Sequence, residues 1–376
     1  MNDFLNRIYH NSPPFIQNLG VNVYGLYWYS RRFGGIFNKM KIQFDNREYY
    51  SYEQWENYQE FQLRLLLKSA YFNVPFYKNL FKEIGLKLQQ IENFHLSDLK
   101  NIPFLTKDDL RKYGKSSLLS NKRNKNGIFL KSSGSTGTPT NIYFSKNVHQ
   151  IWQAACESRI RKWANVDYKM PRATIGGRKI SKINDNIFHK YNYIEKQTYI
   201  SAYHISEKNI SNYVKSLNKN RNQYLTGYAY SIYSLSKIFN SLNLKAPKMH
   251  AVITSSEKLT AEMKKTIEQV FDCKCYDSYS GLETCGMITE TPERKLLLSP
   301  DIGIMELIDS QNKYVQDGMD GEAVFTGFIN HDQPLIRYKI GDIIRKSKNQ
   351  EIIGGRCMPV IDEIIGRLED RIITKD

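Results

Sequence analysis

The sequence has no apolar run of about 18 residues, the length a helix needs to cross a bilayer. Its first fifteen residues, MNDFLNRIYHNSPPF, contain no apolar segment of the kind that defines a secretory signal. Cysteine is scarce, and the five residues form an odd, scattered set that does not suit a disulfide framework. These absences argue against a secreted or membrane-spanning protein. They predict a cytoplasmic protein with free thiols.

The 376 residues contain no internal repeat and no low-complexity linker, and 41% of them are hydrophobic. A chain of this kind can bury one large core or two to three smaller ones. The formal net charge is +16, but the basic residues are spread along the chain and do not cluster. Specific nucleic-acid binding needs a basic patch, so the sequence does not predict it. Two alternatives stay open for this charge: a peripheral contact with anionic membrane, or no functional role.

The order of predicted elements indicates an α/β fold. Helical spacing predicts a helical N-terminal part, with helices over 52–70 and 76–84 and a further capped helix from Thr106 to Gly114. A short strand at 128–130 follows, and then strands near 172–175 and 250–254 alternate with helices. The predicted helices of this part span 146–164, 207–218, 231–240 and 261–271. Such alternation predicts a largely parallel, layered sheet.

Beyond residue 302 the pattern changes to short strands separated by turn residues. The segments IGIMELID, GEAVFTGF and LIRYKIGDIIR read as strands, and Asp309–Asn312 and Asp317–Gly321 read as turns. We therefore expect a small β subdomain here. The cysteines at 273 and 275 lie on an apparent strand, and no second pair at zinc spacing accompanies them. They are predicted to be core residues rather than metal ligands.

The loop KSSGSTGTPT, residues 131–140, is rich in serine, threonine and glycine and follows a predicted strand. Its backbone N–H groups and hydroxyls could hold a polyphosphate, because glycine permits close approach. The loop lacks the GK[ST] ending of a Walker-type phosphate loop. An ordinary solvated turn is the alternative for such a loop taken alone.

The loop is the first of six segments whose order along the chain favours the phosphate-binding interpretation. They resemble the ordered motifs of adenylate-forming enzymes, the acyl-CoA synthetases and their relatives: SSGSTGTPT (132–140), TSSEKL (254–259), YSGLETCG (279–286), GEAVFTGF (321–328), RYKIGDI (337–343) and GRLEDRI (366–372). The phrases LLKSAYFNVPFYKNLF (66–81) and IPFLTKDDLR (102–111) resemble the phenylacetate-CoA ligase branch, and within it the CapK subgroup tied to capsular polysaccharide genes. The resemblance covers nearly the whole chain.

The resemblance implies a large adenylation domain over 1–365, divided into a helical part at 1–95, an α/β core at 96–290 and a β-rich part at 291–365. Residues 366–376 would be a hinge. In the family a small lid domain with the catalytic lysine follows, so the chain is expected to be truncated before the lid, and no lysine here receives that role. The alternative is a protein that works without its own lid.

The implied reaction has two steps and uses ATP and Mg²⁺. A carboxylate attacks the α-phosphate of ATP to give an acyl-adenylate and pyrophosphate, and the acyl group then passes to a thiol, an amine or a sugar hydroxyl. CoA is one candidate acceptor, and attachment to a capsular or other surface polysaccharide is another. The physical task is to position two anionic groups and neutralise their charge.

The resemblance assigns a task to each motif. Glu283 would bind magnesium, and with Thr136 it is a catalytic candidate; Asp342 would accept both ribose hydroxyls, and Tyr279 would pack on adenine. Arg367 would reach the ribose or the phosphates, although a solvated charge is an equal alternative. The remaining nucleotide-binding candidates are the phosphate loop, Ser132, Ser133, Gly134, Ser135, Thr136, Gly137 and Thr138, and the adenine-lining stretch Ser255, Ser256 and Glu257.

The sequence also departs from the family pattern. Ser280 stands at a usual glycine, and Leu282 stands where the family has a hydroxyl side chain, which removes an α-phosphate contact. Many relatives carry a Cys/His zinc cluster after the glutamate, but residues 289–301 here contain neither residue type. No structural zinc is therefore expected.

The acid pocket is expected between the segments RATIGGRK and LTGYAYSIYSLS. Tyr228, Tyr230 and His204 are candidate lining residues, with aromatic core packing as the alternative for each. Arg178 and Lys179 could contact a negatively charged acid or a sugar phosphate, or could lie in a solvated loop. Three functions stay open: an adenylate-forming ligase of the CapK type, an aryl- or acyl-CoA ligase, and a non-catalytic scaffold that retains the fold.

Overall fold

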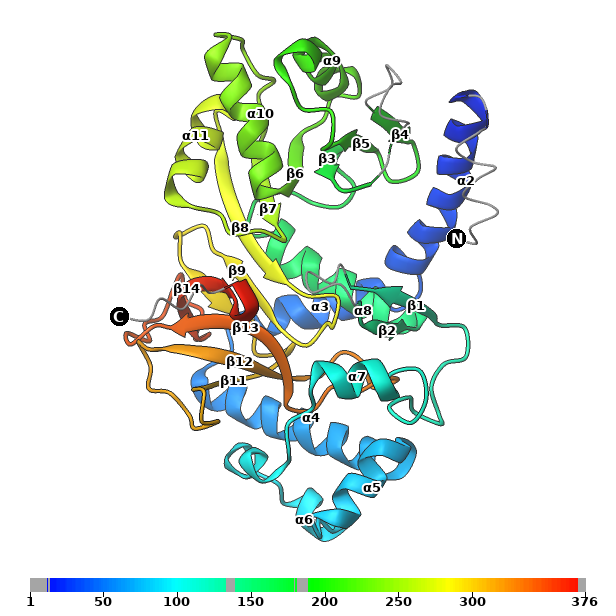
Figure 1. The fold of residues 1–376 in the computed structure, drawn as a ribbon, viewed down its shortest axis with the longest axis vertical. Helices are drawn as coiled ribbons and strands as arrows, with labels where there is room; N and C mark the ends of the chain where they lie inside the picture. Colours follow the sequence, from blue (N-terminus) through cyan, green and yellow to red (C-terminus); the bar gives the residue numbers. More distant parts are fainter. Residues whose placement is uncertain (1–11, 13, 133–138, 179, 181–188, 371–376) are drawn as a thin grey trace. The chain divides into compact units, whose positions relative to one another are not determined.

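The computed structural model of the protein describes residues 12, 14–132, 139–178, 180 and 189–370 (Figure 1). Contacts within the chain divide it into two compact units. Unit 1 comprises Met1–Gly34, Cys156–Tyr279 and Glu290–Pro292, and unit 2 comprises Gly35–Ala155, Ser280–Thr289 and Glu293–Asp376. The sequence-based divisions at residues 95, 290 and 365 stay predictions.

Unit 1 is built on a mainly parallel sheet with the strand order β8-β7-β6-β3-β5-β4. β3 pairs in parallel with β5 and β6, β6 with β7, and β7 with β8, whereas the edge strand β4 is antiparallel to β5. The strands are β3 (Arg172–Gly176), β4 (His189–Asn192), β5 (Gln197–Ser201), β6 (Tyr224–Tyr228), β7 (Ala251–Ser255) and β8 (Lys274–Ser280).

Alternate residues of these strands enter two different apolar clusters, as the two-residue period of a strand requires. Val252 joins the helices on one face, in a core with Leu235 and Phe271, whereas Ala251 and Ile253 join a smaller cluster on the other face. The helices of unit 1 are α2 (Pro14–Phe33), α9 (Ile210–Lys219) after a 3₁₀ turn η3 (Glu207–Asn209), α10 (Ala229–Ser241) and α11 (Ala261–Phe271).

Unit 2 begins with a helical layer whose ends are well capped. Ser51 accepts a hydrogen bond from the Gln54 amide and Thr106 from the Asp109 amide, and both positions form complete capping boxes. The helices are α3 (Phe37–Arg47), α4 (Tyr52–Asn73), α5 (Pro75–Glu83), α6 (Leu88–Glu92), η1 (Leu96–Asn101), α7 (Lys107–Tyr113) and α8 (Lys146–Cys156).

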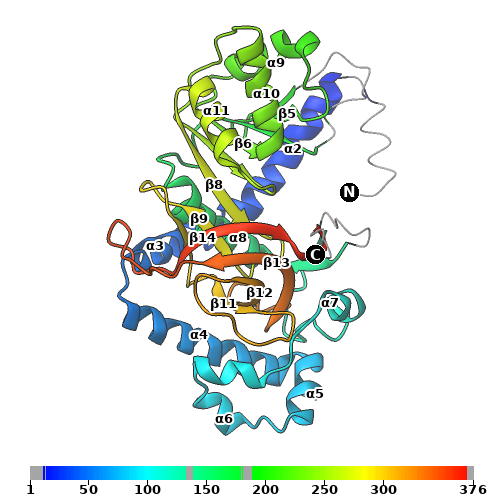
Figure 2. The same cartoon turned by 60° about the vertical axis from the view of Figure 1, so that its left-hand side comes forward.

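The strands of unit 2 form a two-stranded ribbon, β1-β2, and a set with the order β11-β12-β13-β14-β10-β9. Both views show α4, α5 and α6 gathered on one side of β11–β14 (Figure 2). The strands are β1 (Ile128–Lys131), β2 (Asn141–Phe144), β9 (Met287–Glu290), β10 (Leu296–Leu298), β11 (Gly303–Ile308), β12 (Asp320–Gly327), β13 (Tyr338–Lys346) and β14 (Val360–Arg367), followed by a 3₁₀ turn, η4 (Leu368–Asp370).

The α/β class expected from the sequence is confirmed, with two local corrections. The helix predicted over 146–164 is wrong in its second half, because α8 ends at Cys156 and a π-helical turn, η2 (Glu157–Arg161), follows it. The helix predicted from residue 207 begins as the 3₁₀ turn η3 and becomes α-helical at Ile210. The pairing of β1 with β2, on the two sides of the phosphate-like loop, did not follow from the sequence pattern.

Candidate functional site

A cavity of about 260 Å³ lies in unit 1 at the carboxyl ends of β3, β6 and β7. Strand order reverses beside β3, because the chain proceeds from β3 to β4 and β5 on one side and then crosses to β6 on the other. Ligands of open α/β sheets bind outside the carboxyl ends of the strands at such a reversal. This cavity is therefore a candidate ligand site on topology alone.

Hydroxyl side chains and glycines supply most of the cavity lining. Arg178 is the one charged residue among the described lining residues, and its guanidinium carbon lies 4.3 Å from the centre of the Tyr199 ring. The lining residues are Thr174, Ile175, Gly176, Gly177, Arg178, Tyr199, Ile200, Thr226, Gly227, Tyr228 and Ser255. A cavity of this small volume with one cation in its described lining suits a small anionic ligand better than a long alkyl chain.

The three residues predicted for the acid pocket lie in different environments. Tyr228 lines the cavity. Tyr230, on the first turn of α10, is 61% exposed and outside the lining. His204 is buried, and its Nδ1 lies 2.6 Å from the hydroxyl of Ser201 at the end of β5. The cavity therefore includes one of the three.

The stretch predicted to border adenine follows β7 directly. Ser255 lines the cavity, and Ser256 has a left-handed backbone with φ of 69°, a conformation that costs a non-glycine residue free energy and often marks a functional turn. Glu257 Oε2 accepts a 2.8 Å hydrogen bond from the backbone of Tyr230 and so helps to cap α10. Tyr279 lies one residue beyond Ser278, the β8 partner of Ser255, so it stands beside the same stretch.

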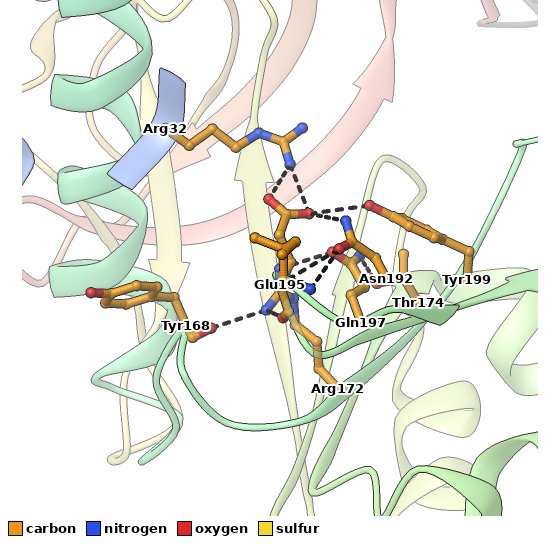
Figure 3. Close-up of polar contacts among 9 residues, drawn as sticks. Arg32, Tyr168, Arg172, Thr174, Asn192, Glu195, Gln197 and Tyr199 are labelled. Carbon is orange, nitrogen blue, oxygen red and sulfur yellow. Dashed lines mark hydrogen bonds and ion pairs between the residues drawn. The ribbon is translucent and has the colours of Figure 1, made fainter. Parts of the chain in front are cut away.

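A buried polar network supports one side of the cavity (Figure 3). Glu195 Oε2 accepts a hydrogen bond from the hydroxyl of Tyr199, and Glu195 Oε1 accepts one from Arg32 of α2 at 3.0 Å. Gln197 links Arg172 to the hydroxyl of Thr174, at 2.8 and 2.6 Å. Because Tyr199 and Thr174 both line the cavity, these bonds fix the position of its polar wall.

In unit 2, Asp342 and Arg367 form a cross-strand pair. The two residues are register partners on β13 and β14, and Arg367 Nε lies 3.0 Å from Asp342 Oδ1. Asp342 is 5% exposed, and a bulge follows it at Ile343/Ile344. Bulges next to a site re-aim side chains, so this carboxylate has a fixed direction.

Glu283 lies within electrostatic reach of this pair. Burial raises the pKa of Glu283, the Asp342 carboxylate acts in the same direction, and Arg367 and Lys107 oppose both. Lys107 Nζ lies 3.6 Å from Glu369 Oε1, and its terminal atoms pass close to Gly341, where a Cβ would approach Nζ to 2.8 Å. Two carboxylates and two cations therefore meet in unit 2 from four separate sequence segments.

Most of the predicted phosphate loop, including Ser133, Gly134, Ser135, Thr136, Gly137 and Thr138, lies outside the described residues, as does Lys179. Ser132 is described, and its hydroxyl accepts hydrogen bonds from the amide and the hydroxyl of Thr140 at 2.9 and 3.0 Å. These bonds join the two ends of the loop.

Sequence reasoning did not single out Lys107 or Arg337. Lys107 follows the Thr106 capping box, which places it on the first turn of α7. Arg337 is buried, has a left-handed backbone with φ of 51°, and pairs with Glu306 while donating to the carbonyl oxygens of Lys100 and Ile102. The capping box and the position of Arg337 in the RYKIGDI motif were the signals in the sequence for these residues.

Comparison with known proteins gives relatives in two groups. No family model matches the chain. The chain is 29% identical to Protein CapK of Staphylococcus aureus over 99% of its own length and 80% of that protein. It is 27% identical to a phenylacetate-coenzyme A ligase of Pseudomonas putida over 88% of its own length and 74% of that protein.

A solved structure shows the same fold. The structure of 2-hydroxyisobutyryl-CoA ligase in complex with 2-HIB-AMP matches with a TM-score of 0.68 at 19% identity, over 87% of this chain and 71% of that chain. Within the described part of the chain, no helix combines the length and apolar character needed to cross a bilayer. The sequence similarity over most of the chain and the shared fold support a relationship to the adenylate-forming branch that contains CapK and the phenylacetate-CoA ligases.

Proposed function

We propose that this chain activates a carboxylic acid with ATP, forming an acyl-adenylate and releasing pyrophosphate. The observation that carries the proposal is the cluster of Glu283, Asp342, Arg367 and Lys107 in unit 2. Burial and then the Asp342 carboxylate disfavour the charged form of Glu283, and a bound cation would offset this cost. A nucleotide site uses both carboxylates, one for ribose hydroxyls and one for a cation.

Each residue of this cluster has a task in the proposed reaction. Asp342, an ionised acceptor, would receive hydrogen bonds from the two ribose hydroxyls. Arg367 orients Asp342 in the structure and would remain next to the ribose. Lys107 would offset part of the negative charge of the polyphosphate. The cavity of unit 1, with Tyr228 and Arg178, would hold the acid.

Glu283 fits a magnesium ion. Mg²⁺ binds carboxylate oxygen and usually takes one or two protein carboxylates together with substrate phosphates, so a single glutamate is a sufficient protein ligand. When bound, the ion would neutralise phosphate charge. The raised pKa of Glu283 means that burial disfavours its charged form, and a cation would reverse this effect.

The second step requires an acceptor. We propose a thiol such as CoA as the first candidate, because the relatives named as phenylacetate-coenzyme A ligases are similar over most of the chain. Transfer to an amine or to a sugar hydroxyl of a surface polysaccharide precursor is the alternative, and it rests on the similarity to CapK. A cytoplasmic location stays a prediction from the sequence.

The test of the first step is acid-dependent exchange of labelled pyrophosphate into ATP, with a panel of aromatic, fatty, amino and sugar acids. Exchange with one class would establish adenylation and identify the substrate type. The longest natural form of the protein should be used. Adding CoA and measuring thioester formation then separates the two acceptors. A protein that binds neither ATP nor AMP would support the non-catalytic scaffold instead.

The variant Asp342→Asn tests the proposed contact with the ribose hydroxyls. Because ribose is common to ATP and AMP, the variant should weaken the binding of both by about tenfold or more, the loss of one or two charge-assisted hydrogen bonds. Titration calorimetry measures both constants. Asp320→Asn is the control, since Asp320 forms an ion pair with Arg345 elsewhere in unit 2. An unchanged AMP affinity in Asp342→Asn would refute the ribose assignment.

A further inference from the structure

Helix α2 has a row of exposed apolar side chains on its outward side. Ile16, Leu19, Val23, Leu26 and Tyr27 recur at the three- and four-residue spacing of one helix face. They are 44%, 65%, 65%, 58% and 48% exposed. Surface helices normally bury such a stripe, so α2 is reversed relative to the usual pattern.

The opposite face of α2 is attached to the sheet edge by polar contacts. Asn22 bonds with the carbonyl of Tyr191 and the amide of Tyr193, at 3.4 and 2.8 Å. Gly25 packs so closely that a Cβ there would lie 2.4 Å from Asn192. Figure 1 shows α2 running beside β4. These contacts fix which side of the helix points away from unit 1.

The end of α2 is held by an ion pair with a buried glutamate. Arg32 donates to Glu195, whose side chain is 1% exposed and which also accepts from Tyr199 (Figure 3). Arg31 lies buried next to the ring of Tyr27. The orientation of the apolar stripe is thus determined by the contacts of Asn22, Gly25 and Arg32, and rotation of the helix would break all of them.

We propose that the apolar stripe of α2 lies on the surface of an anionic lipid bilayer. The helix contains no Asp or Glu, whereas the chain as a whole has a formal net charge of +16. Anionic lipid attracts such a protein and does not repel any residue of this helix. Tyr24, Tyr27 and Trp28 form an aromatic group along the helix, and tyrosine and tryptophan are the side chains favoured at the headgroup level.

The helix would lie in the interface rather than across the bilayer. It has 20 residues, but one of its sides carries Gln17, Asn22 and Arg32, whose contacts are with unit 1. An amphipathic helix of this type buries its apolar side at the boundary of headgroups and acyl chains. Binding of α2 to lipid would locate the protein at a membrane and does not depend on the proposed adenylation activity.

The experiment is co-sedimentation of the full chain with vesicles of phosphatidylcholine alone or mixed equally with phosphatidylglycerol. We expect binding to the mixed vesicles that is weakened, but not abolished, by added salt. The variant Leu19→Gln/Val23→Gln/Leu26→Gln should reduce the partition coefficient at least about tenfold, because three apolar side chains lose their burial in lipid. Leu242→Gln/Leu244→Gln is the control, with two exposed leucines elsewhere in unit 1, and should bind like the wild type.

Thermal melting checks that the triple variant folds. If it does not, the single variant Leu19→Gln should still lower the partition by about threefold. The proposal is overturned if the wild type binds neither vesicle type, or if the triple variant binds as well as the wild type. Light scattering is run in parallel. A wild-type dimer that the triple variant converts to a monomer would show that a second copy covers the stripe, which also overturns the proposal.

Discussion

At the scale of single residues, the two candidate sites, the cavity of unit 1 and the cluster of unit 2, differ in the charged side chains that they contain. The cavity of unit 1 has one charged lining residue among those described, Arg178, which lies on the ring of Tyr199. The cluster of unit 2 contains two carboxylates and two cations. An acid with an extra negative group would therefore find a partner in the first site, and a polyphosphate with its cation would find partners in the second.

Arg178 gives a prediction about substrate charge. Succinate and its monoamide have nearly the same size but differ by one charge, so a guanidinium facing the cavity should favour succinate by about fivefold, the effect of one partly solvated ion pair. Arg178→Gln should remove this preference. Comparison of the two acids as binding ligands, or as substrates in pyrophosphate exchange, measures it. Arg221→Gln, at the opposite end of β6, is the control, and equal discrimination in both variants would contradict the role of Arg178.

Asp277 gives a prediction about pH. Burial, and then the nearby Glu290, raise the pKa of Asp277 well above the ordinary range of an aspartate, to about 7. In the unfolded chain this carboxyl ionises near pH 4, while in the folded protein it keeps its proton until about pH 7. Its contribution to stability is therefore fully present below pH 4 and is lost as the pH rises to 7.

Asp277→Asn should remove the loss of folding stability between pH 4 and pH 7. The variant should be more stable than the wild type at pH 8, by a free energy of unfolding on the order of 2 kcal/mol, and the difference should shrink towards pH 4. Thermal or denaturant unfolding at pH 5 and pH 8 measures it. Asp272→Asn alters an exposed ion pair with Lys248 and should show no such pH dependence. A constant difference across this range would show that Asp277 titrates normally.

At the scale of secondary-structure elements, the close packing of β6 against β3 shapes the cavity. A Cβ on Gly227 would lie 2.0 Å from the carbonyl oxygen of Ile175, whereas a Cβ on Gly176 would meet nothing within 4 Å. Both glycines line the same cavity. The two strands can pair in parallel at this point only because Gly227 has no side chain.

Gly227→Ala and Gly176→Ala form a matched pair. Gly227→Ala should destabilise the protein by about 1–3 kcal/mol, the cost of overpacking, and should weaken acid binding because β6 must move. Gly176→Ala should leave the melting temperature nearly unchanged. Differential scanning fluorimetry with and without the substrate acid measures both effects. Similar melting temperatures for the two variants would mean that the strand pair adjusts without cost.

At the scale of the whole molecule, the division into two units predicts separate losses of stability. Glu48 and Arg356, far apart in the sequence, form a 2.8 Å ion pair that is almost fully buried within unit 2. Glu48→Gln would remove one of two carboxylates beside the buried Arg356 guanidinium, while Glu293 Oε2 stays at 3.4 Å, and the loss of this charged hydrogen bond costs about 1.5–3 kcal/mol. Hydrogen exchange should show reduced protection in peptides of unit 2 and not in those of unit 1.

The control for this variant is Glu351→Gln, which breaks an ion pair with Lys295 whose side chains are about half exposed. A surface pair contributes little, so protection should stay the same in both units. Equal loss of protection in both units of Glu48→Gln would show that the chain unfolds as one cooperative body.

The sequence alone was sufficient to predict the fold class, most of the helices, and the order of the motifs that indicate an adenylate-forming enzyme. These features depend on local periodicity, capping and short motifs. Helix α11 was predicted with its observed bounds, Ala261–Phe271, because its apolar spacing and the Thr260 cap are both local signals. The phosphate loop stays a prediction, since most of it lies outside the described residues.

Which side chains contact one another followed only from the folded structure. Lys107 reaches the surroundings of Glu283 and Asp342 through contacts between segments hundreds of residues apart, which no local pattern encodes. Tyr230 was placed next to Tyr228 by the sequence, yet successive residues at the start of a helix point in different directions, and only Tyr228 lines the cavity. The reversed orientation of α2 is of the same kind. The exposed position of its apolar stripe follows from contacts of the helix with β4 and Glu195, and this helix was not predicted from the sequence.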